Sequence, residues 1–216
     1  MKACETEATK PASRKECSEI SIRKAGFCVI KRIFDIVAAV VAGLLFLLPM
    51  IVIAIVVRLD SPGPAIYKQE RLGLNRKPFV LYKFRSMYLD AERNGPRWAD
   101  KDDERVTRIG QFLRNTRLDE LPQLWNILAG EMSFVGPRPE RACFYEVFET
   151  YIPNFGQRMR VKPGLTGWAQ VNGGYDLSPE EKIVYDLEYI EKQSLLMDLV
   201  CLLKTARLVF THEGAR

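Results

Sequence analysis

Residues 36–57 read "IVAAVVAGLLFLLPMIVIAIVV" and contain no polar side chain. As an α-helix, a segment of this length would extend about 33 Å, which is close to the thickness of the hydrocarbon core of a bilayer. The composition therefore predicts a helical segment that lies in lipid. This segment decides the fold, because the rest of the chain must then be arranged at the faces of a membrane.

Basic residues flank this segment on both sides. Positive charge beside a membrane segment normally stays on the cytoplasmic side, so two basic flanks indicate that the chain enters and leaves by the same face. Pro49 falls past the midpoint and removes a backbone hydrogen bond, which bends a helix. These features fit a helix–break–helix hairpin, and a single-pass helix with a tolerated proline kink fits them as well. The flanking residues are Arg23, Lys24, Lys31 and Arg32 before the segment and Arg58, Lys68, Arg71, Arg76, Lys77, Lys83 and Arg85 after it.

The chain divides into three parts by composition. Residues 1–28 are polar and without period, which predicts a flexible leader. Residues 29–58 form the membrane segment, at whose start Asp35 is expected to pair with Arg32 or Lys31. Residues 59–216 are long enough for one membrane-associated domain with its own core.

Secondary-structure signals in the third part are mainly helical. Helical spacing begins near Val106, and "SPEE" (178–181) has the form of a capping box that starts a helix ending near Gln193. The expected fold class is therefore α+β and mostly helical, with a short β-hairpin and amphipathic or interfacial helices around one active site. The other expected elements are strands "AIYKQE" and "FVLYKFRSM" within 65–87, a surface loop over 88–104, and helices from Asp119 to Gly130, over 140–151 and over 195–210.

Charge and composition narrow the class of ligand. The net charge is +5 and the pI is near 8.9, which favours an anionic partner: nucleic acid, a phosphorylated metabolite or an acidic membrane surface. The five cysteines form no CxxC pair and are expected to be unpaired thiols. The single histidine, His212, excludes a multi-histidine metal site and disfavours histidine catalysis.

Two neighbouring acids stand out in "LDELPQLWNILAGEMSFVGPRP" (118–139). At a helix N-cap, Asp119 would face unpaired N–H groups that keep it ionised, and Glu120 follows it directly. An ionised carboxylate can attack phosphorus or bind a hard cation such as Mg²⁺. The plainer interpretation is that Asp119 caps the helix and Glu120 improves its dipole.

Basic side chains around the two acids favour the chemical interpretation. Arginine forks suit phosphate oxygens, and the flanking prolines of "GPRP" fix the backbone of one of them. The loop "VKPGLTGWAQVNGG" (161–174) could present backbone N–H groups to a sugar or nucleotide, or be a tightly packed turn. The candidate phosphate-binding residues are Arg114, Arg117 and Arg138 near the acids, and Lys83 and Arg85 in "KFR".

Together these stretches resemble the bacterial sugar transferase family, the monotopic polyprenyl-phosphate phosphoglycosyl transferases of the small catalytic-core type. The likeness covers about residues 29–211. It rests on "KRIFD", the proline-broken apolar segment, "QERLG", "YKFRSM", "LDELPQLWNILAGEMSFVGPRP" and "VKPGLTGWAQVNG".

The resemblance implies a re-entrant membrane helix that breaks at Pro49, a monotopic placement on the cytoplasmic face of the inner membrane, and dependence on Mg²⁺. It also implies two steps, in which Asp119 attacks the β-phosphate of a UDP-sugar, releases UMP and then passes the sugar phosphate to polyprenyl (undecaprenyl) phosphate. This reaction would be the first membrane step of polysaccharide or glycan assembly. Asp119 and Glu120 are the implied catalytic and metal-binding residues, and the expected substrate-binding residues are Arg114, Arg138, Lys83, Arg85 and Lys162.

Two departures from the family pattern are visible. Many relatives have Ser-Pro at the helix break, where this chain has Leu48 and Pro49, so no serine hydroxyl can stabilise the bend. Relatives often read "RPG" and "NGR", where this chain has Lys162 and "GGYD" (173–176). The second difference lies in the loop that we associate with sugar recognition.

Two other classes of function compete with the transferase. A non-catalytic membrane anchor or scaffold for glycan-assembly enzymes would bind membrane and be indifferent to Asp119. A metal-dependent phosphohydrolase would pass the sugar phosphate to water. A second copy of the chain and downstream glycosyltransferases are the further partners considered, and the lack of a stacking platform or reader motif disfavours nucleic acid.

Overall fold

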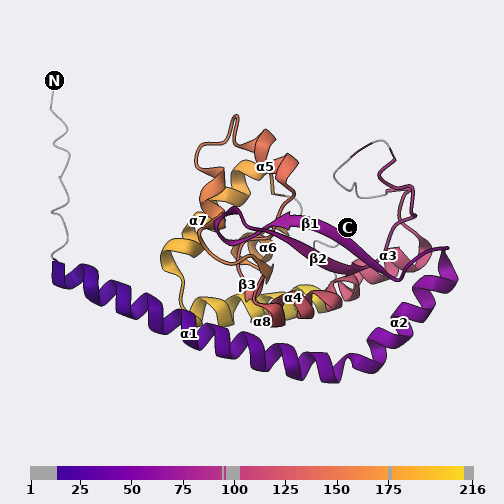
Figure 1. The fold of residues 1–216 in the computed structure, drawn as a ribbon, viewed down its shortest axis with the longest axis horizontal. Coiled ribbons are helices and arrows are strands. Elements are labelled where there is room, and N and C mark those ends of the chain that lie inside the picture. Colours follow the sequence, from indigo (N-terminus) through magenta and orange to yellow (C-terminus); the bar gives the residue numbers. More distant parts are fainter. Residues whose placement is uncertain (1–13, 94, 96–102, 175–176, 212–216) are drawn as a thin grey trace.

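The computed structural model describes residues 14–93, 95, 103–174 and 177–211 and is mostly helical, as expected. Two short pairs of strands complete it (Figure 1). The elements are α1 (Arg14–Leu45), α2 (Leu47–Asp60), β1 (Ile66–Leu72), η1 (Leu74–Arg76), β2 (Pro78–Phe84), α3 (Arg108–Asn115), η2 (Leu118–Gln123), α4 (Leu124–Ala129), β3 (Ser133–Val135), α5 (Ala142–Phe148), η3 (Phe155–Arg160), β4 (Gly164–Thr166), α6 (Trp168–Asn172), α7 (Pro179–Lys192) and α8 (Leu195–Thr211).

Helices α1 and α2 form an arc along one side of the molecule (Figure 1). The break between them lies at Phe46, and the two helices are bent by 62°. Pro49 sits in the first turn of α2, where it has no N–H to donate to the carbonyl of Leu45, so the helical ladder stops there. Among the described residues no single helix is long and apolar enough to cross a bilayer, whereas the bent pair that starts at Gly26 has the required length and composition.

The N-terminal boundary differs from expectation. Helix α1 begins at Arg14, so residues 14–28, expected as part of a flexible leader, are helical and continuous with the apolar segment. The remaining leader, residues 1–13, lies outside the described residues. A polar sequence without apolar period gave no helix signal here.

Polar contacts fix α1 to the rest of the molecule. The Arg32 guanidinium donates to the carbonyls of Ile127 (2.5 Å) and Leu128 (2.8 Å) in the last turn of α4. The Asp35 carboxylate is buried and accepts hydrogen bonds from the Ser133 hydroxyl (3.1 Å) and the Phe134 N–H (3.0 Å). The expected local pair of Asp35 with Arg32 or Lys31 is therefore wrong, because Arg32 donates to the α4 carbonyls and Lys31 pairs with Asp198 on α8 (2.5 Å).

Both predicted strands form the expected antiparallel hairpin, with Tyr67 opposite Lys83. A second, parallel pair of strands, β3 and β4, was not predicted. Strands of three residues are too short to show a period in sequence. The capping box is confirmed at Ser178 and Glu181, and α7 ends at Lys192, next to its predicted end.

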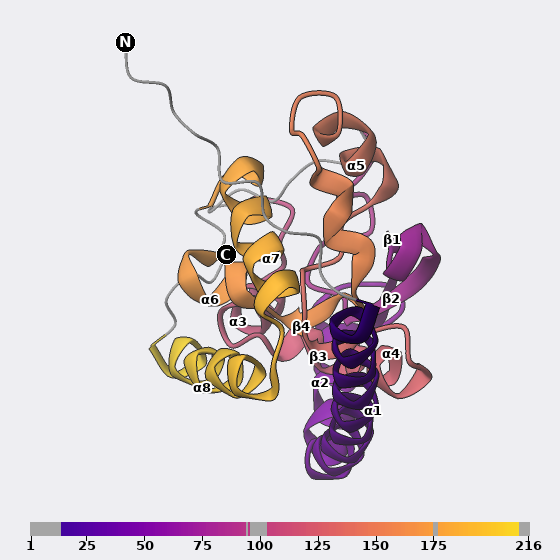
Figure 2. The same cartoon turned by 90° about the vertical axis from the view of Figure 1, so that its left-hand side faces the viewer.

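Helix α8 lies along the same side of the molecule as α1 (Figures 1 and 2). Its Cys201 is fully buried against α7, whereas Leu196 and Leu203 are 71 % and 64 % exposed. The helix is thus amphipathic, with one face packed into the core and the other exposed.

The Asp35 contacts predict a measurable contribution to stability. In Asp35→Ala, the Ser133 hydroxyl and the Phe134 N–H lose their buried acceptor, which should lower the free energy of unfolding by about 1–3 kcal/mol. Thermal or denaturant unfolding in detergent micelles measures this loss. The exposed Asp90→Ala is the control and should change stability by less than about 0.5 kcal/mol. Equal stability of the two variants would contradict the proposed anchoring of α1.

Candidate active site

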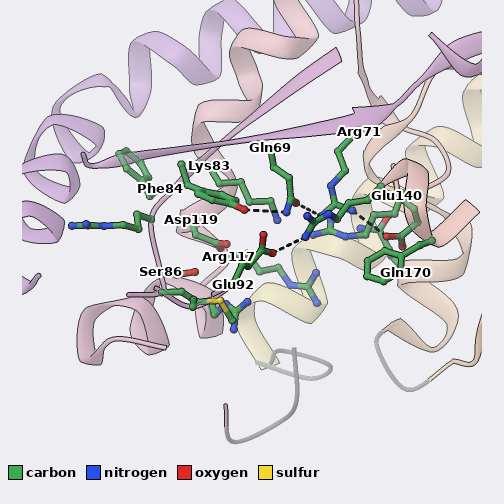
Figure 3. A pocket seen from close by; sticks show the side chains of 18 of the residues that line it. Gln69, Arg71, Lys83, Phe84, Ser86, Glu92, Arg117, Asp119, Glu140 and Gln170 are labelled. Carbon is green, nitrogen blue, oxygen red and sulfur yellow. Dashed lines mark hydrogen bonds and ion pairs between the residues drawn. The ribbon is translucent and has the colours of Figure 1, made fainter. Parts of the chain in front are cut away.

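A cavity of about 380 Å³ lies beneath the β1–β2 hairpin (Figure 3). Side chains from the hairpin, α3, η2 and the loop after β3 converge on it. Half of the lining residues are charged, and most of these are basic. The polar and charged lining residues include Tyr67, Gln69, Arg71, Lys83, Arg85, Glu92, Arg114, Arg117, Asp119, Arg138, Glu140, Arg141, Arg158, Gln170 and Lys182.

The two acids lie in η2, where Asp119 lines this cavity and Glu120, which is not among the lining residues, follows it directly. Arg117 precedes η2 with φ 58°, a left-handed conformation that turns the chain sharply before the acids. Asp119 is therefore in the first turn of a 3₁₀-helix rather than at an N-cap, and its side chain forms no cap. The expected N-cap is wrong because the turn at Arg117 makes that residue the N-cap, two residues earlier than Asp119. Both acids are buried, with exposed fractions of 7 % for Asp119 and 8 % for Glu120.

Glu120 is held by two cations that come from different parts of the chain. One of its carboxylate oxygens, Oε1, accepts a hydrogen bond from the Lys83 ammonium (3.1 Å) on β2 and another from the Arg138 guanidinium. Burial alone would raise the pKa of this carboxyl, but the charges of Arg138 and Lys83 outweigh burial and hold the pKa well below its usual range. Glu120 is therefore ionised at any physiological pH.

Asp119 is in a different state from its neighbour. Within the part of the chain that the structure describes, its carboxylate accepts no hydrogen bond and forms no ion pair. Burial raises the pKa of Asp119 to about 6, with Lys83 and Arg138 lowering it and Glu120 raising it. Figure 3 shows Asp119 and Lys83 directed toward the same space. Asp119 is thus a carboxylate available to react, surrounded by positive charge.

Of the other predicted residues, Arg114 and Arg85 have contrasting positions. Arg114, in the last turn of α3, lines the cavity beside Asp119, and its Nη1 is buried without a partner among the described residues. Arg85 touches the cavity wall, but its guanidinium donates to the carbonyls of Pro62, Val57 (3.3 Å) and Ser61 (2.6 Å) at the end of α2. Its expected role in substrate binding is corrected to that of a cap on α2.

Lys162 is also corrected. Its ammonium lies beside Gly130 and the Arg32 guanidinium, outside the residues that line the cavity. Burial and the nearby charge of Arg32 lower its pKa. The chain from 161 to 174 reaches the cavity instead through Gln170 and Gly174, and residues 175–176 of "GGYD" lie outside the described residues.

Several lining residues were not predicted from sequence. Tyr67, Gln69 and Arg71 share the face of the hairpin that carries Lys83, because alternate residues of a strand point to the same side. That alternation in "YKQER" was the signal available in the sequence. Glu92 and Arg141, which form an ion pair (2.6 Å) at the cavity, come from loops and gave no such signal.

The two carboxylates fit a magnesium ion that takes its other ligands from water and substrate. No group of three or more metal-ligating side chains occurs in the described residues, so a complete protein cage is not available there. Mg²⁺ usually takes only one or two carboxylates and completes its octahedron with water and substrate phosphates. The unpaired carboxylate of Asp119, and Oε2 of Glu120, which accepts no hydrogen bond from the described residues, suit that mode of binding.

The sequence of this chain matches a known protein family and several of its members. Residues 27–212 match the sequence model of the bacterial sugar transferases. Three relatives are similar over most of this chain. A UDP-N-acetylgalactosamine-undecaprenyl-phosphate N-acetylgalactosaminephosphotransferase of Aeromonas hydrophila is 44 % identical over 88 % of this chain. Two UDP-glucose:undecaprenyl-phosphate glucose-1-phosphate transferases, of Xanthomonas campestris pv. campestris and Caulobacter vibrioides, are 44 % and 40 % identical over 91 % and 86 % of it.

The length of the relatives varies. The aligned region is 46 % of the Aeromonas protein, 43 % of the Xanthomonas protein and 71 % of the Caulobacter protein. The chain therefore spans about half the length of the first two relatives.

The new role of Arg85 predicts a loss of stability. In Arg85→Met, three carbonyls at the end of α2, two of them buried, lose their donor, which should lower the free energy of unfolding by about 2–4 kcal/mol. Denaturant unfolding in micelles provides the measurement, with the exposed Arg58→Met on the same helix as control. If Arg85→Met were as stable as the control and instead bound anionic ligands poorly, the correction would be refuted.

Proposed function

Because the chain belongs to the bacterial sugar transferase family, we propose that it transfers a sugar 1-phosphate from a UDP-sugar to a polyprenyl phosphate such as undecaprenyl phosphate. The observation that carries this proposal is the Asp119 carboxylate, which is buried, unpaired among the described residues and surrounded by cations. The names of the relatives support the same pair of substrates.

The first step is attack by Asp119 on the β-phosphorus of the UDP-sugar. A bond forms between a carboxylate oxygen and phosphorus, the bond from phosphorus to the bridging oxygen breaks, and UMP leaves with that oxygen. The approach of one anion to another needs positive charge, which Lys83, Arg114 and Arg138 supply at fixed positions. Their placement before the substrate arrives lowers the cost of reorganisation in the transition state.

The second step regenerates the acid. A phosphate oxygen of polyprenyl phosphate attacks the aspartyl phosphosugar, the acyl–phosphate bond breaks, and Asp119 returns as a carboxylate. The product is a polyprenyl diphosphate-linked sugar, and the sugar–oxygen bond is never broken. This chemistry balances without an oxidant, a reductant or water.

Asp119 and Glu120 would hold Mg²⁺ together with the substrate phosphates. When bound, Mg²⁺ would neutralise charge that develops on the phosphate oxygens. Two cations hold Glu120 in its ionised form through Oε1. Its other oxygen, Oε2, accepts no hydrogen bond from the described residues and would bind the ion.

The bent pair α1–α2 is proposed as a re-entrant segment on the cytoplasmic face of the inner membrane. Large apolar side chains on both helices are exposed, among them Leu44, Leu45 and Leu48 at 70–71 %. Helix α8 lies on the same side of the molecule as α1 (Figure 2) and carries exposed leucines, and it would lie at the membrane interface. This placement brings a lipid-linked phosphate to a site that also receives a soluble nucleotide sugar.

Covalent capture tests the role of Asp119. Purified protein with Mg²⁺ and a panel of UDP-sugars, without lipid acceptor, should gain the mass of a sugar phosphate on the peptide containing Asp119 and release UMP. Asp119→Asn should lose the adduct and lower turnover by about 10³-fold or more, because the amide is a poor nucleophile.

The exposed Glu146→Gln is the control and should keep both activities. Release of free sugar phosphate would indicate a phosphohydrolase. Membrane binding without UMP release from any UDP-sugar, even with polyprenyl phosphate present, would indicate an anchor and contradict the proposal.

The raised pKa of Asp119 predicts an acid limb in the pH profile. The attacking carboxylate must be ionised, so kcat/KM for the UDP-sugar should be flat above the pKa of about 6 and fall about tenfold for each pH unit below it. Lys83→Met removes a charge that lowers this pKa, so the limb should move to higher pH. A limb that stays in place in Lys83→Met would show that another group titrates.

A further inference from the structure

The loop of residues 136–139, "GPRP", is held at its start by the N–H of Gly136, which donates to the carbonyl of Thr166 (2.9 Å), and after that by its own carbonyl groups. Two of its residues are prolines and have no N–H. Pro137 accepts a hydrogen bond from the N–H of Gly164 (2.9 Å), and Pro139 accepts one from the guanidinium of Arg71 (3.1 Å). The carbonyl of Arg138 itself lies between these two points and accepts a hydrogen bond from a third donor.

That donor is Arg158, whose Nη2 lies 3.1 Å from the Arg138 carbonyl. Arg158 is only 3 % exposed and forms an ion pair of 2.7 Å with Asp186 on α7. Its guanidinium also lies over the ring of Phe155, at 4.9 Å from the ring centre. The position of Arg158 is therefore determined by two groups outside the GPRP loop, Asp186 and Phe155.

A buried ion pair is weak evidence of a stabilising role. The cost of removing both charges from water is often not recovered, and apolar residues of similar size commonly serve stability as well or better. The Arg158–Asp186 pair lies next to an aromatic cluster that includes Tyr145 and Phe155, where apolar residues would pack readily. What an apolar pair could not provide is the N–H group that reaches the Arg138 carbonyl.

We propose that Arg158, oriented by Asp186, is a positioning residue that fixes the GPRP loop so that Arg138 meets Glu120 and the substrate phosphates. The inference rests on the proposed function, because it assigns α7 a part in that reaction. Arg158 lines the cavity, yet its bond to the Arg138 carbonyl places its effect through Arg138. Without that bond the loop can move, and Glu120 would lose one of its two cations.

The test replaces the ion pair by apolar residues in the full chain, as Arg158→Met with Asp186→Leu. We expect this double variant to keep a melting temperature near that of the wild type, while kcat falls about 10- to 100-fold, as is typical for a misplacement near 1 Å. The acid limb of kcat/KM should also move to higher pH, because Asp119 loses the nearby charge of Arg138. A purely structural pair would leave that limb unmoved.

Tyr145→Phe is the matched control, since it changes the same core next to Arg158 but touches no loop carbonyl. It should keep wild-type kcat and pH profile. A folded double variant with wild-type kcat and an unmoved limb would overturn the inference. If the double variant does not fold, Asp186→Asn decides in its place: a lower kcat with a moved limb supports the inference, and a wild-type profile overturns it.

A failure of the proposed function can be distinguished from a failure of the positioning role of Arg158. If the wild type releases no UMP from any UDP-sugar, the proposed reaction fails whatever the variants do. Binding of UDP by calorimetry then tests the positioning alone: weaker binding to the folded double variant than to Tyr145→Phe supports it, and equal binding overturns it.

Discussion

The structure depends on one electrostatic constraint, which is that two adjacent carboxylates are buried together. A buried carboxylate is unfavourable unless cations or hydrogen bonds compensate it. Lys83 from the hairpin and Arg138 from the GPRP loop meet on a single oxygen of Glu120 and compensate that charge. The hairpin and the loop are far apart in sequence, so this contact defines where each must lie.

Compensating Glu120 leaves Asp119 in an unusual state. The same cations are near it, but none is bonded to it in the described structure, and its pKa is raised rather than lowered. Two identical functional groups, one residue apart, thus have opposite properties. A difference between the pKa values of two carboxylates suits a site in which one must remain an anion and the other must react.

The sequence allowed prediction of most helices, the hairpin and the residues at the centre of the site. Its signals were local: apolar length for α1–α2, alternation for β1 and β2, and a capping box for α7. Arg85 and Lys162 were misassigned because a basic residue near a motif has the same appearance whether it faces a substrate or a carbonyl. Arg158 and Asp186 were missed since their pairing joins η3 to α7, and no local pattern encodes a contact across that distance.

The attachment of α1 has a consequence for how the chain could be divided. Ala39 and Ala42 of α1 pack with Phe79, Leu81 and Ile127 in one core cluster, and Arg32 caps the end of α4. The apolar helix is therefore a wall of the domain as well as its proposed tether. Deletion of residues before 61 to obtain a soluble fragment would remove that wall, and exchange for an unrelated hydrophobic helix would not restore it. Solubilisation of this fold by redesign has to retain the inward face of α1 and change only the outward one.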